Sequence, residues 1–467
     1  MNSWLLLILL SLLQCLTGLG LISLFNIWLK PAMLVALWML TGVAVFSIIP
    51  FLLQLFYIPL TATNIFLALV IACLLLNTKY KRSFDYLKKV YQRRSFRMRL
   101  YEIPFLIIIV VLVLISLWRC YYWPPTPRDL TSGAEVIAEY ATKEKTMINS
   151  VFSVNLESTN NQFKPPFITS LQIIYKYAGF PFGQLWLSTL FISFLVFLYQ
   201  AMGTTLHKLL AGLLLVAFIA IPEMYAYTFM VLFDYSNAVF FFLSAWFVFE
   251  YFKTSEKNYL RVAGLLMGIA TYIRSETLIL ACFMAIVLVW HHARGRHGIR
   301  KLLLSLITFM LPAAILYILS ITIYVNYYLP SAYNIGGLVN PDLLNLKPLA
   351  TRFIAVNERL LFSEQGIIYY GYFFFIFLLI LLIDLAWFRK QNPASRNWLF
   401  AVLVIYLGLP LLGYLLPLMD IDNSTKRAFM KMFPLMLLYM SNSTSLLCLS
   451  EKIKSWEESR EDGKSAA

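Results

Sequence analysis

The chain has 467 residues, of which 60% are hydrophobic, 16% are aromatic and only 13% are charged. A soluble domain carries about 25% charged and roughly 45–50% apolar residues, so this composition excludes a soluble enzyme and a disordered chain. The five cysteines lie in or beside apolar runs without C-x-x-C spacing, which excludes a disulfide scaffold and gives no sign of a zinc site. We therefore expect an all-α polytopic membrane protein.

The apolar runs set the expected number of membrane spans. A helix needs about 20 apolar residues to cross roughly 30 Å of hydrocarbon, and by this criterion the sequence predicts about 13 transmembrane helices. They cover residues 4–28, 32–53, 57–77, 103–118, 182–200, 208–222, 226–250, 260–273, 277–290, 302–327, 368–388, 398–418 and 428–449. The eighth and ninth segments are short, and the alternative to two spans is a hairpin around Arg274 that does not cross fully.

The distribution of basic residues predicts the orientation. The loop 79–102 carries nine lysines and arginines, and basic loops stay in the cytoplasm. With this loop inside, the cytoplasmic side holds 25 basic and ten acidic residues, and the opposite side holds 13 of each. The net charge of +15 is therefore a topology signal, and we expect no nucleic-acid partner.

Two long segments, 119–181 and 328–367, fall on the outward side. Loops of this length are uncommon unless they are functional. In the first, Ser132 and Glu135 have the spacing of a capping box, with Ser132 as N-cap. A second helical pattern begins near Pro165-Pro166. We expect two short amphipathic helices that lie on the membrane surface.

The first outward segment also holds two candidate site residues. Asp129 lies beside Arg128, just after the rigid Pro124-Pro125-x-Pro127 run, and Lys164 opens the motif Lys-Pro-Pro-Phe. A lysine at the entry to a helix can meet a lipid phosphate, helped by the helix N–H groups. The alternatives are structural: an ion pair with Arg128 for Asp129, and interfacial snorkelling for Lys164.

Three further ionisable residues interrupt apolar patterns. Asp234 begins a nearly continuous apolar helix, and Arg274 and Glu276 separate two apolar segments. Charged groups so close to hydrocarbon are costly, which makes them candidates for function. Residues two apart on a helix do not face one another, so we expect Arg274 and Glu276 to have different partners. The alternative for all three is an ordinary role at a helix end.

The last apolar segment is preceded by the pair Lys426-Arg427 on the outward side. Arginine offers a bidentate fork and lysine a point charge, so the pair resembles a cationic clamp for phosphate. Asp420 and Asp422 come just before it, and neutralisation by these acids is the alternative.

Together, the early loop aspartate, the Lys-Pro-Pro-Phe motif, the Asp-Tyr helix, the Gly-Leu-Leu-Met-Gly-Ile-Ala…Arg-Ser-Glu run and the final Lys-Arg…Phe-Pro resemble one family. The order is similar to that of the GT-C superfamily of integral-membrane glycosyltransferases, especially bacterial aminoarabinose transferases of lipid A and protein O-mannosyltransferases. Close relatives often have an Asp-Glu pair, whereas Asp129 is followed by Leu130.

The resemblance implies roles for these residues. Asp129 corresponds to the catalytic base, Lys164 to a phosphate-binding lysine, and Lys426 and Arg427 to cations that hold the lipid phosphate. Arg128, Asp234, Arg274 and Glu276 would shape the site. The expected organisation is extra transmembrane helices at 1–78, a basic cytoplasmic loop at 79–102, a GT-C-like catalytic domain at 103–449 and a charged cytoplasmic tail at 450–467.

The expected activity is sugar transfer from a polyprenyl-phosphate-linked donor to a lipid, glycan or protein on the outer face of a bacterial cytoplasmic membrane. A phosphate leaving group needs no proton, so one base is sufficient, and cations stabilise the growing charge. No cofactor follows from these residues, and a divalent metal stays open. The alternative is a transporter or flippase of a polyprenyl-linked saccharide, which would place ionisable groups near the bilayer midplane. Asp384 is the main residue in its favour.

Overall fold

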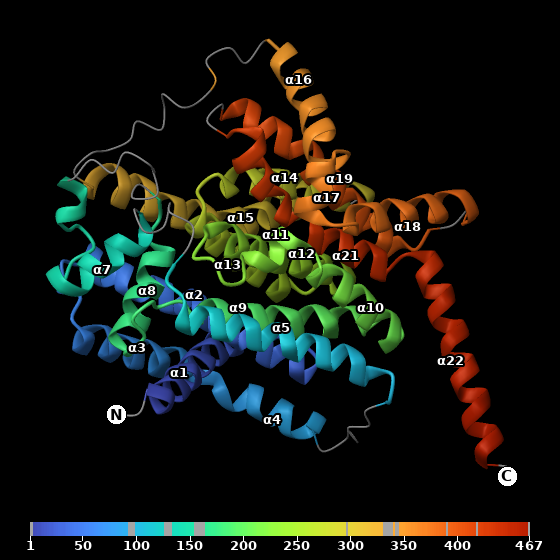
Figure 1. Ribbon diagram of the computed structural model, residues 1–467, viewed down its shortest axis with the longest axis horizontal. Coiled ribbons are helices and arrows are strands. Elements are labelled where there is room, and N and C mark those ends of the chain that lie inside the picture. The colour runs from blue at the N-terminus through green and yellow to red at the C-terminus, as the bar shows by residue number, and fades with distance from the viewer. Residues whose placement is uncertain are drawn as a thin grey trace. The chain divides into compact units, whose positions relative to one another are not determined.

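The computed structural model describes residues 3–91, 99–125, 133–153, 164–295, 298–329, 340, 345–388, 391–416 and 419–465. Throughout these ranges the regular structure is helical, with no β-strand (Figure 1). The all-α class predicted from composition is confirmed for this part of the chain.

The chain divides into two compact units. Unit 1 comprises residues 1–95, 113–194 and 226–341, and unit 2 comprises residues 96–112, 195–225 and 342–467. Three helices contain residues of both units: α5 (Glu102–Tyr122), α9 (Leu185–Met202) and α11 (Pro222–Ala226).

The other helices belong to one unit each. Unit 1 contains α1 (Ser3–Ser23), α2 (Pro31–Leu55), α3 (Ala62–Leu76), η1 (Asn77–Lys79), α4 (Tyr80–Tyr91), α7 (Ala134–Glu144), η2 (Ser150–Ser153), α8 (Phe167–Tyr177), α12 (Phe233–Thr254), α13 (Lys257–Ile273), α14 (Thr277–Arg294), α15 (Ile299–Tyr317) and η4 (Ile318–Tyr328). Unit 2 contains α10 (Lys208–Ile219), α16 (Lys347–Val356), η6 (Asn357–Leu361), α17 (Glu364–Tyr370), α18 (Phe373–Trp387), α19 (Pro393–Leu415), η7 (Ile421–Thr425), α20 (Lys426–Ala428), η8 (Phe429–Lys431), α21 (Phe433–Ser441) and α22 (Thr444–Ser465).

Eight helices in the described ranges are long and apolar enough to cross a membrane, or up to ten if each of two bent helix pairs is one span. The chain is therefore a multi-pass membrane protein, although the expected 13 spans are more than length and composition support. Three predicted segments account for the difference. Helix α10 has 12 residues, α13 has 17, and α12 carries Asp234 and several other polar residues along an entirely buried stretch.

The centre of unit 1 is built around α13, which packs against both α12 and α15. Gly264 and Gly268 make this approach close. A Cβ on Gly264 would lie 2.6 Å from the Thr308 carbonyl oxygen, and one on Gly268 would lie 3.0 Å from the Pro312 carbonyl. Small residues four apart let two helix backbones meet in a membrane protein. The glycines therefore fix α13 against α15.

The two helices expected on the membrane surface both form, but their surroundings differ from the prediction. Helix α8 begins one residue after Pro166, and its residues Phe167–Tyr175 are all buried against protein. An amphipathic helix with one exposed face is therefore the wrong description of α8, which packs against α2 and α7. Helix α7 keeps an exposed side, where Tyr140 is 39% exposed.

Candidate functional site

The Lys-Pro-Pro-Phe motif opens α8 in a defined way. Pro165 and Pro166 are buried, and Pro166 occupies the N-cap position of α8. Phe167 packs edge-on against Trp186 and Tyr272, with ring centroids 6.0 Å apart in both pairs. The prolines restrict the backbone and the aromatic ring anchors it. This arrangement fixes the position of the residue before them, Lys164.

The Lys164 side chain lies over the first residue of α12. Its Nζ is 5.1 Å from the centroid of the Phe233 ring, within the range of a cation–π interaction. Phe233 is followed directly by Asp234, one of the sequence candidates. The structure therefore brings Lys164 to the start of α12.

Asp234, Arg274 and Glu276 form a buried charge cluster in unit 1. Arg274 pairs with Asp234 through Nη1 and with Glu276 through Nε. Asp234 is 1% exposed and Arg274 is 8% exposed. Buried carboxylates and guanidinium groups are tolerated when they are paired in this way.

The pairing of Arg274 with Glu276 corrects the expectation that the two would have different partners. That expectation assumed a continuous helix. Instead α13 ends at Ile273, and Arg274 has an extended backbone with φ −141° and ψ 117°. The hairpin alternative predicted a break here, and the break lets side chains two residues apart meet.

A neutral polar contact reinforces the same junction. Asn237, one turn after Asp234 on α12, donates from Nδ2 to the Ala270 carbonyl at 2.6 Å and to Thr277 Oγ1 at 2.9 Å. Helix α12 thus holds the end of α13 and the start of α14 through two separate sets of polar contacts. Asn237 was not among the sequence candidates, although its spacing from Asp234 places both on one face.

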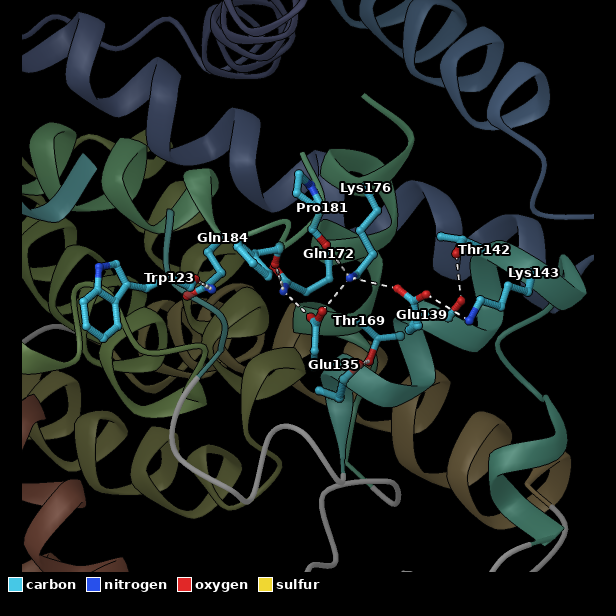
Figure 2. Close-up of polar contacts among 12 residues, drawn as sticks. Trp123, Glu135, Glu139, Thr142, Lys143, Thr169, Gln172, Lys176, Pro181 and Gln184 are labelled. Carbon is cyan, nitrogen blue, oxygen red and sulfur yellow. Dashed lines mark hydrogen bonds and ion pairs between the residues drawn. The ribbon is translucent and has the colours of Figure 1, made fainter. Parts of the chain in front are cut away.

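A second buried network, which sequence reasoning missed, joins α7 to α8 (Figure 2). Lys176 Nζ lies 2.5 Å from Glu135 Oε1 and 3.2 Å from Glu139 Oε2. Gln172 donates to Glu135 and accepts from Trp186 Nε1 at 2.8 Å. This network sets the orientation of α8, and so supports the placement of Lys164 at its start.

The role of Glu135 corrects the predicted capping box. Gly133 is the N-cap of α7, with no side-chain cap, and Ser132 lies outside the described residues. Burial raises the pKa of Glu135, opposed by the charge of Lys176. The hydrogen bond with Lys143 lowers the pKa of the more exposed Glu139, with a further contribution from Lys176.

The predicted clamp residues Lys426 and Arg427 lie in unit 2. Lys426 Nζ is 2.8 Å from Glu223 Oε1 and 4.0 Å from the centroid of the Tyr369 ring. Arg427 Nε donates to the Asn423 carbonyl at 3.3 Å. Lys426 is therefore held by a carboxylate and an aromatic face, both distant in the sequence.

The acids expected to neutralise this pair are used elsewhere. Asp420 is the N-cap of η7 and accepts from the Ser424 N–H at 2.8 Å. Asp422 lies 3.6 Å from Arg359 Nη1. Glu223, rather than either aspartate, is the carboxylate paired with Lys426.

Asp129 and Arg128 lie outside the described residues. Lys164 belongs to unit 1, whereas Lys426 and Arg427 belong to unit 2. The convergence of the aspartate with these cations therefore stays a prediction. Among the described residues there is no group of three or more His, Cys, Asp or Glu side chains that could hold a metal ion.

Comparisons with protein-family models, with curated proteins and with solved structures gave no match to this chain. The GT-C resemblance therefore depends on the residues and motifs of the sequence itself. The side-chain clusters described above are the structural basis for the function proposed below.

Proposed function

We propose that this protein is an integral-membrane glycosyltransferase. It transfers a sugar from a polyprenyl-phosphate-linked donor to a lipid, glycan or protein on the outer face of a bacterial cytoplasmic membrane. Asp129 acts as the base that activates the acceptor, and Lys164 holds the donor phosphate. Lys426 and Arg427, in unit 2, are the other cations to which the sequence resemblance assigns phosphate binding.

One observation supports this proposal most. The Lys-Pro-Pro-Phe motif directs its lysine to the start of α12, over Phe233, next to the buried Asp234–Arg274–Glu276 cluster. Charged groups buried in a membrane protein are costly, which makes them candidates for function. The cluster carries two acids and one base, so its formal charge is −1, and Lys164 adds a positive charge at the start of α12.

The proposed chemistry uses these charges directly. The acceptor hydroxyl or amine loses its proton to Asp129 as its oxygen or nitrogen forms a bond to the anomeric carbon. The bond from that carbon to the phosphate oxygen breaks, and the electron pair leaves with the phosphate. Lys164 stabilises the charge that grows on the phosphate. Attack from the opposite face inverts the anomeric carbon.

Asp384, the residue that favoured the transporter alternative, gives it little support. Asp384 is fully buried, and its carboxylate accepts from the Thr444 N–H at 3.1 Å and the Ser445 N–H at 2.9 Å. These N–H groups belong to the first turn of α22, where a carboxylate is a normal cap. A structural role therefore accounts for Asp384 without ion or proton movement.

Substitution of Asp129 tests the proposed base. Mass spectra of envelope lipids and glycans are compared between cells with the wild-type protein, with Asp129→Asn and without the protein. We expect a sugar modification in wild-type cells that falls at least about 100-fold in the variant, because a general base contributes about 10²–10⁴ in rate. Asp85→Asn, at an exposed aspartate of α4, is the matched control. Normal modification by Asp129→Asn would refute the base assignment.

Substitution of Lys164 tests the phosphate contact. Lys164→Ala should raise the apparent KM for the lipid-linked donor about 10-fold or more, since hydrogen bonds to charged groups contribute about 1.5–3 kcal/mol. Lys257→Ala removes an exposed lysine of unit 1 and should leave KM unchanged. An unaltered donor KM in Lys164→Ala would remove the proposed role.

A further inference from the structure

Arg352 of α16 has an unusual environment for an arginine in unit 2. Its Nη2 donates to the Met419 carbonyl and to Thr425 Oγ1 at 2.7 Å. No carboxylate of the described residues forms an ion pair with it. Asp420, the nearest acid in sequence to these partners, is engaged as the cap of η7. Arg352 therefore has no ion-pair partner in the described part of unit 2, and Asp420 acts on it only through a longer-range charge interaction.

Several N–H donors of Arg352 also have no acceptor among the described residues. A guanidinium has five donors and no acceptor, and the two acceptors above are both met by Nη2. The Nε atom is buried and has no hydrogen-bond partner among the described residues. A buried donor without an acceptor is costly, and the great majority of such groups are satisfied by protein, water or ligand. Burial also lowers the pKa of Arg352, with Asp420 acting in the opposite direction.

The neighbouring helix provides the space for this side chain. The guanidinium lies over Gly413 of α19, and a Cβ at that position would collide with its Nε, Cζ and Nη2 atoms. Helices α16 and α19 pack against each other, and Tyr414 donates to the Asn345 carbonyl, just before α16, at 2.9 Å. The glycine thus lets the charged group lie against the helix backbone.

The side chain also lies beside the predicted clamp. Its partner Thr425 directly precedes Lys426, and Lys426 is already paired with Glu223. Of these two cations, Arg352 is the one that forms no ion pair within the described residues.

We propose that Arg352 binds a phosphate-type oxyanion, with the guanidinium held over Gly413 as its receptor. The assignment to the phosphate of a polyprenyl-linked donor rests on the proposed function. Arginine suits this ligand because its planar donors match the oxygens of a phosphate. The site adds a binding residue that neither the Lys-Pro-Pro-Phe motif nor the Lys-Arg pair contains.

Direct binding to the full-length protein in lipid nanodiscs tests this site. The probes are polyprenyl phosphate, the same polyprenol without phosphate, and inorganic phosphate. We expect Arg352→Gln to bind polyprenyl phosphate about 10- to 100-fold more weakly than wild type, and Arg352→Lys to retain part of the affinity. Arg396→Gln, at an exposed arginine of α19, should bind normally. Polyprenol binding should be the same in all variants.

Gly413→Ala gives an independent test that keeps the arginine in place. The added methyl group displaces the guanidinium, so phosphate binding should weaken in the same direction as in Arg352→Gln. If Arg352 only fastens α16 to the α19–η7 connection, both variants lose thermal stability without ligand and bind polyprenyl phosphate as wild type does. That result would overturn the proposal.

The remaining outcomes separate the ligand source and the two proposals. Inorganic phosphate that binds as tightly as the lipid, and depends on Arg352, would assign the site to soluble phosphate. Weakened binding in Arg352→Gln, with no sugar transfer by wild type, would retain the oxyanion site and refute the glycosyltransferase. Sugar transfer by wild type with unchanged binding in Arg352→Gln would refute the site alone.

Discussion

Two arginines, one in each unit, show contrasting solutions to the same physical problem. Arg274 is buried in unit 1 and pairs with two carboxylates, Asp234 and Glu276. Arg352 is half-buried in unit 2 and donates to a carbonyl and a hydroxyl. Both charges are partly removed from water, but only the first forms ion pairs with the residues around it in the described structure.

The difference separates an arginine that is paired with two carboxylates from one that donates only to neutral acceptors. A buried pair that is complete resists disruption, because loss of one partner leaves an uncompensated charge. An arginine held by neutral acceptors keeps its positive charge available to a ligand. Arg274 therefore fixes the junction between α13 and α14, and Arg352 offers a binding group.

The largest expected difference is in the free energy of unfolding after removal of each arginine. Arg274→Met leaves Asp234 and Glu276 without their cation and should lower the free energy of unfolding by about 3–5 kcal/mol. Arg352→Met loses two hydrogen bonds and should cost about 1–2 kcal/mol without ligand. Equilibrium unfolding in detergent measures both. Equal losses would show that the two sites do not differ in kind.

Lys176 is a second cation of unit 1 that is paired with carboxylates, so its removal should also destabilise the fold. Lys176→Met should lower the free energy of unfolding by about 3 kcal/mol, because Glu135 is left buried without its charge partner. The double variant with Glu135→Gln should lose less than the sum of the two single variants, with a coupling of about 0.5–3 kcal/mol. Strict additivity would mean that the pair contributes no interaction energy.

The apolar segments and the Lys-Pro-Pro-Phe motif predicted where most helices form, because helix formation and proline restriction are local. Each of the 13 predicted segments overlaps at least one helix, and Lys164 was correctly placed before a helix. The pairings were not predictable in the same way. Glu223 and Lys426 are joined by tertiary packing, and sequence spacing pointed instead to Asp420 and Asp422. The Arg274–Glu276 pair was missed because the spacing rule applies within a helix.

Alanine substitutions at one glycine in each unit should give smaller losses of stability than the substitutions above. Gly264→Ala directs a methyl group at the backbone carbonyl of Thr308 and should cost about 1–3 kcal/mol, as overpacking does. Gly413→Ala meets side-chain atoms of Arg352, which can shift more easily than backbone, so it should cost less, roughly 1 kcal/mol or under. Gly298 has open space around it, and Gly298→Ala is the control. A larger loss at Gly413 than at Gly264 would contradict a movable guanidinium.

The smallest expected effect concerns pH. The raised pKa of Glu135 means that the folded protein binds this proton more readily than the unfolded chain. Its contribution to stability is therefore present below the ordinary glutamate pKa of 4.5 and is lost as the pH rises through the folded pKa. The melting temperature of wild type should fall relative to that of Glu135→Gln between pH 4 and pH 8. A difference that stays constant across this range would contradict the raised pKa.

The close approach of α13 to α15 also limits how unit 1 can move. With carbonyl groups of α15 against Gly264 and Gly268, and polar side chains of α12 tied to the α13–α14 junction, sliding of one of these helices past another would break several contacts at once. Any rearrangement of unit 1 should therefore carry α12, α13 and α15 together as one body, and the hinges should lie in the segments that lead into and out of them.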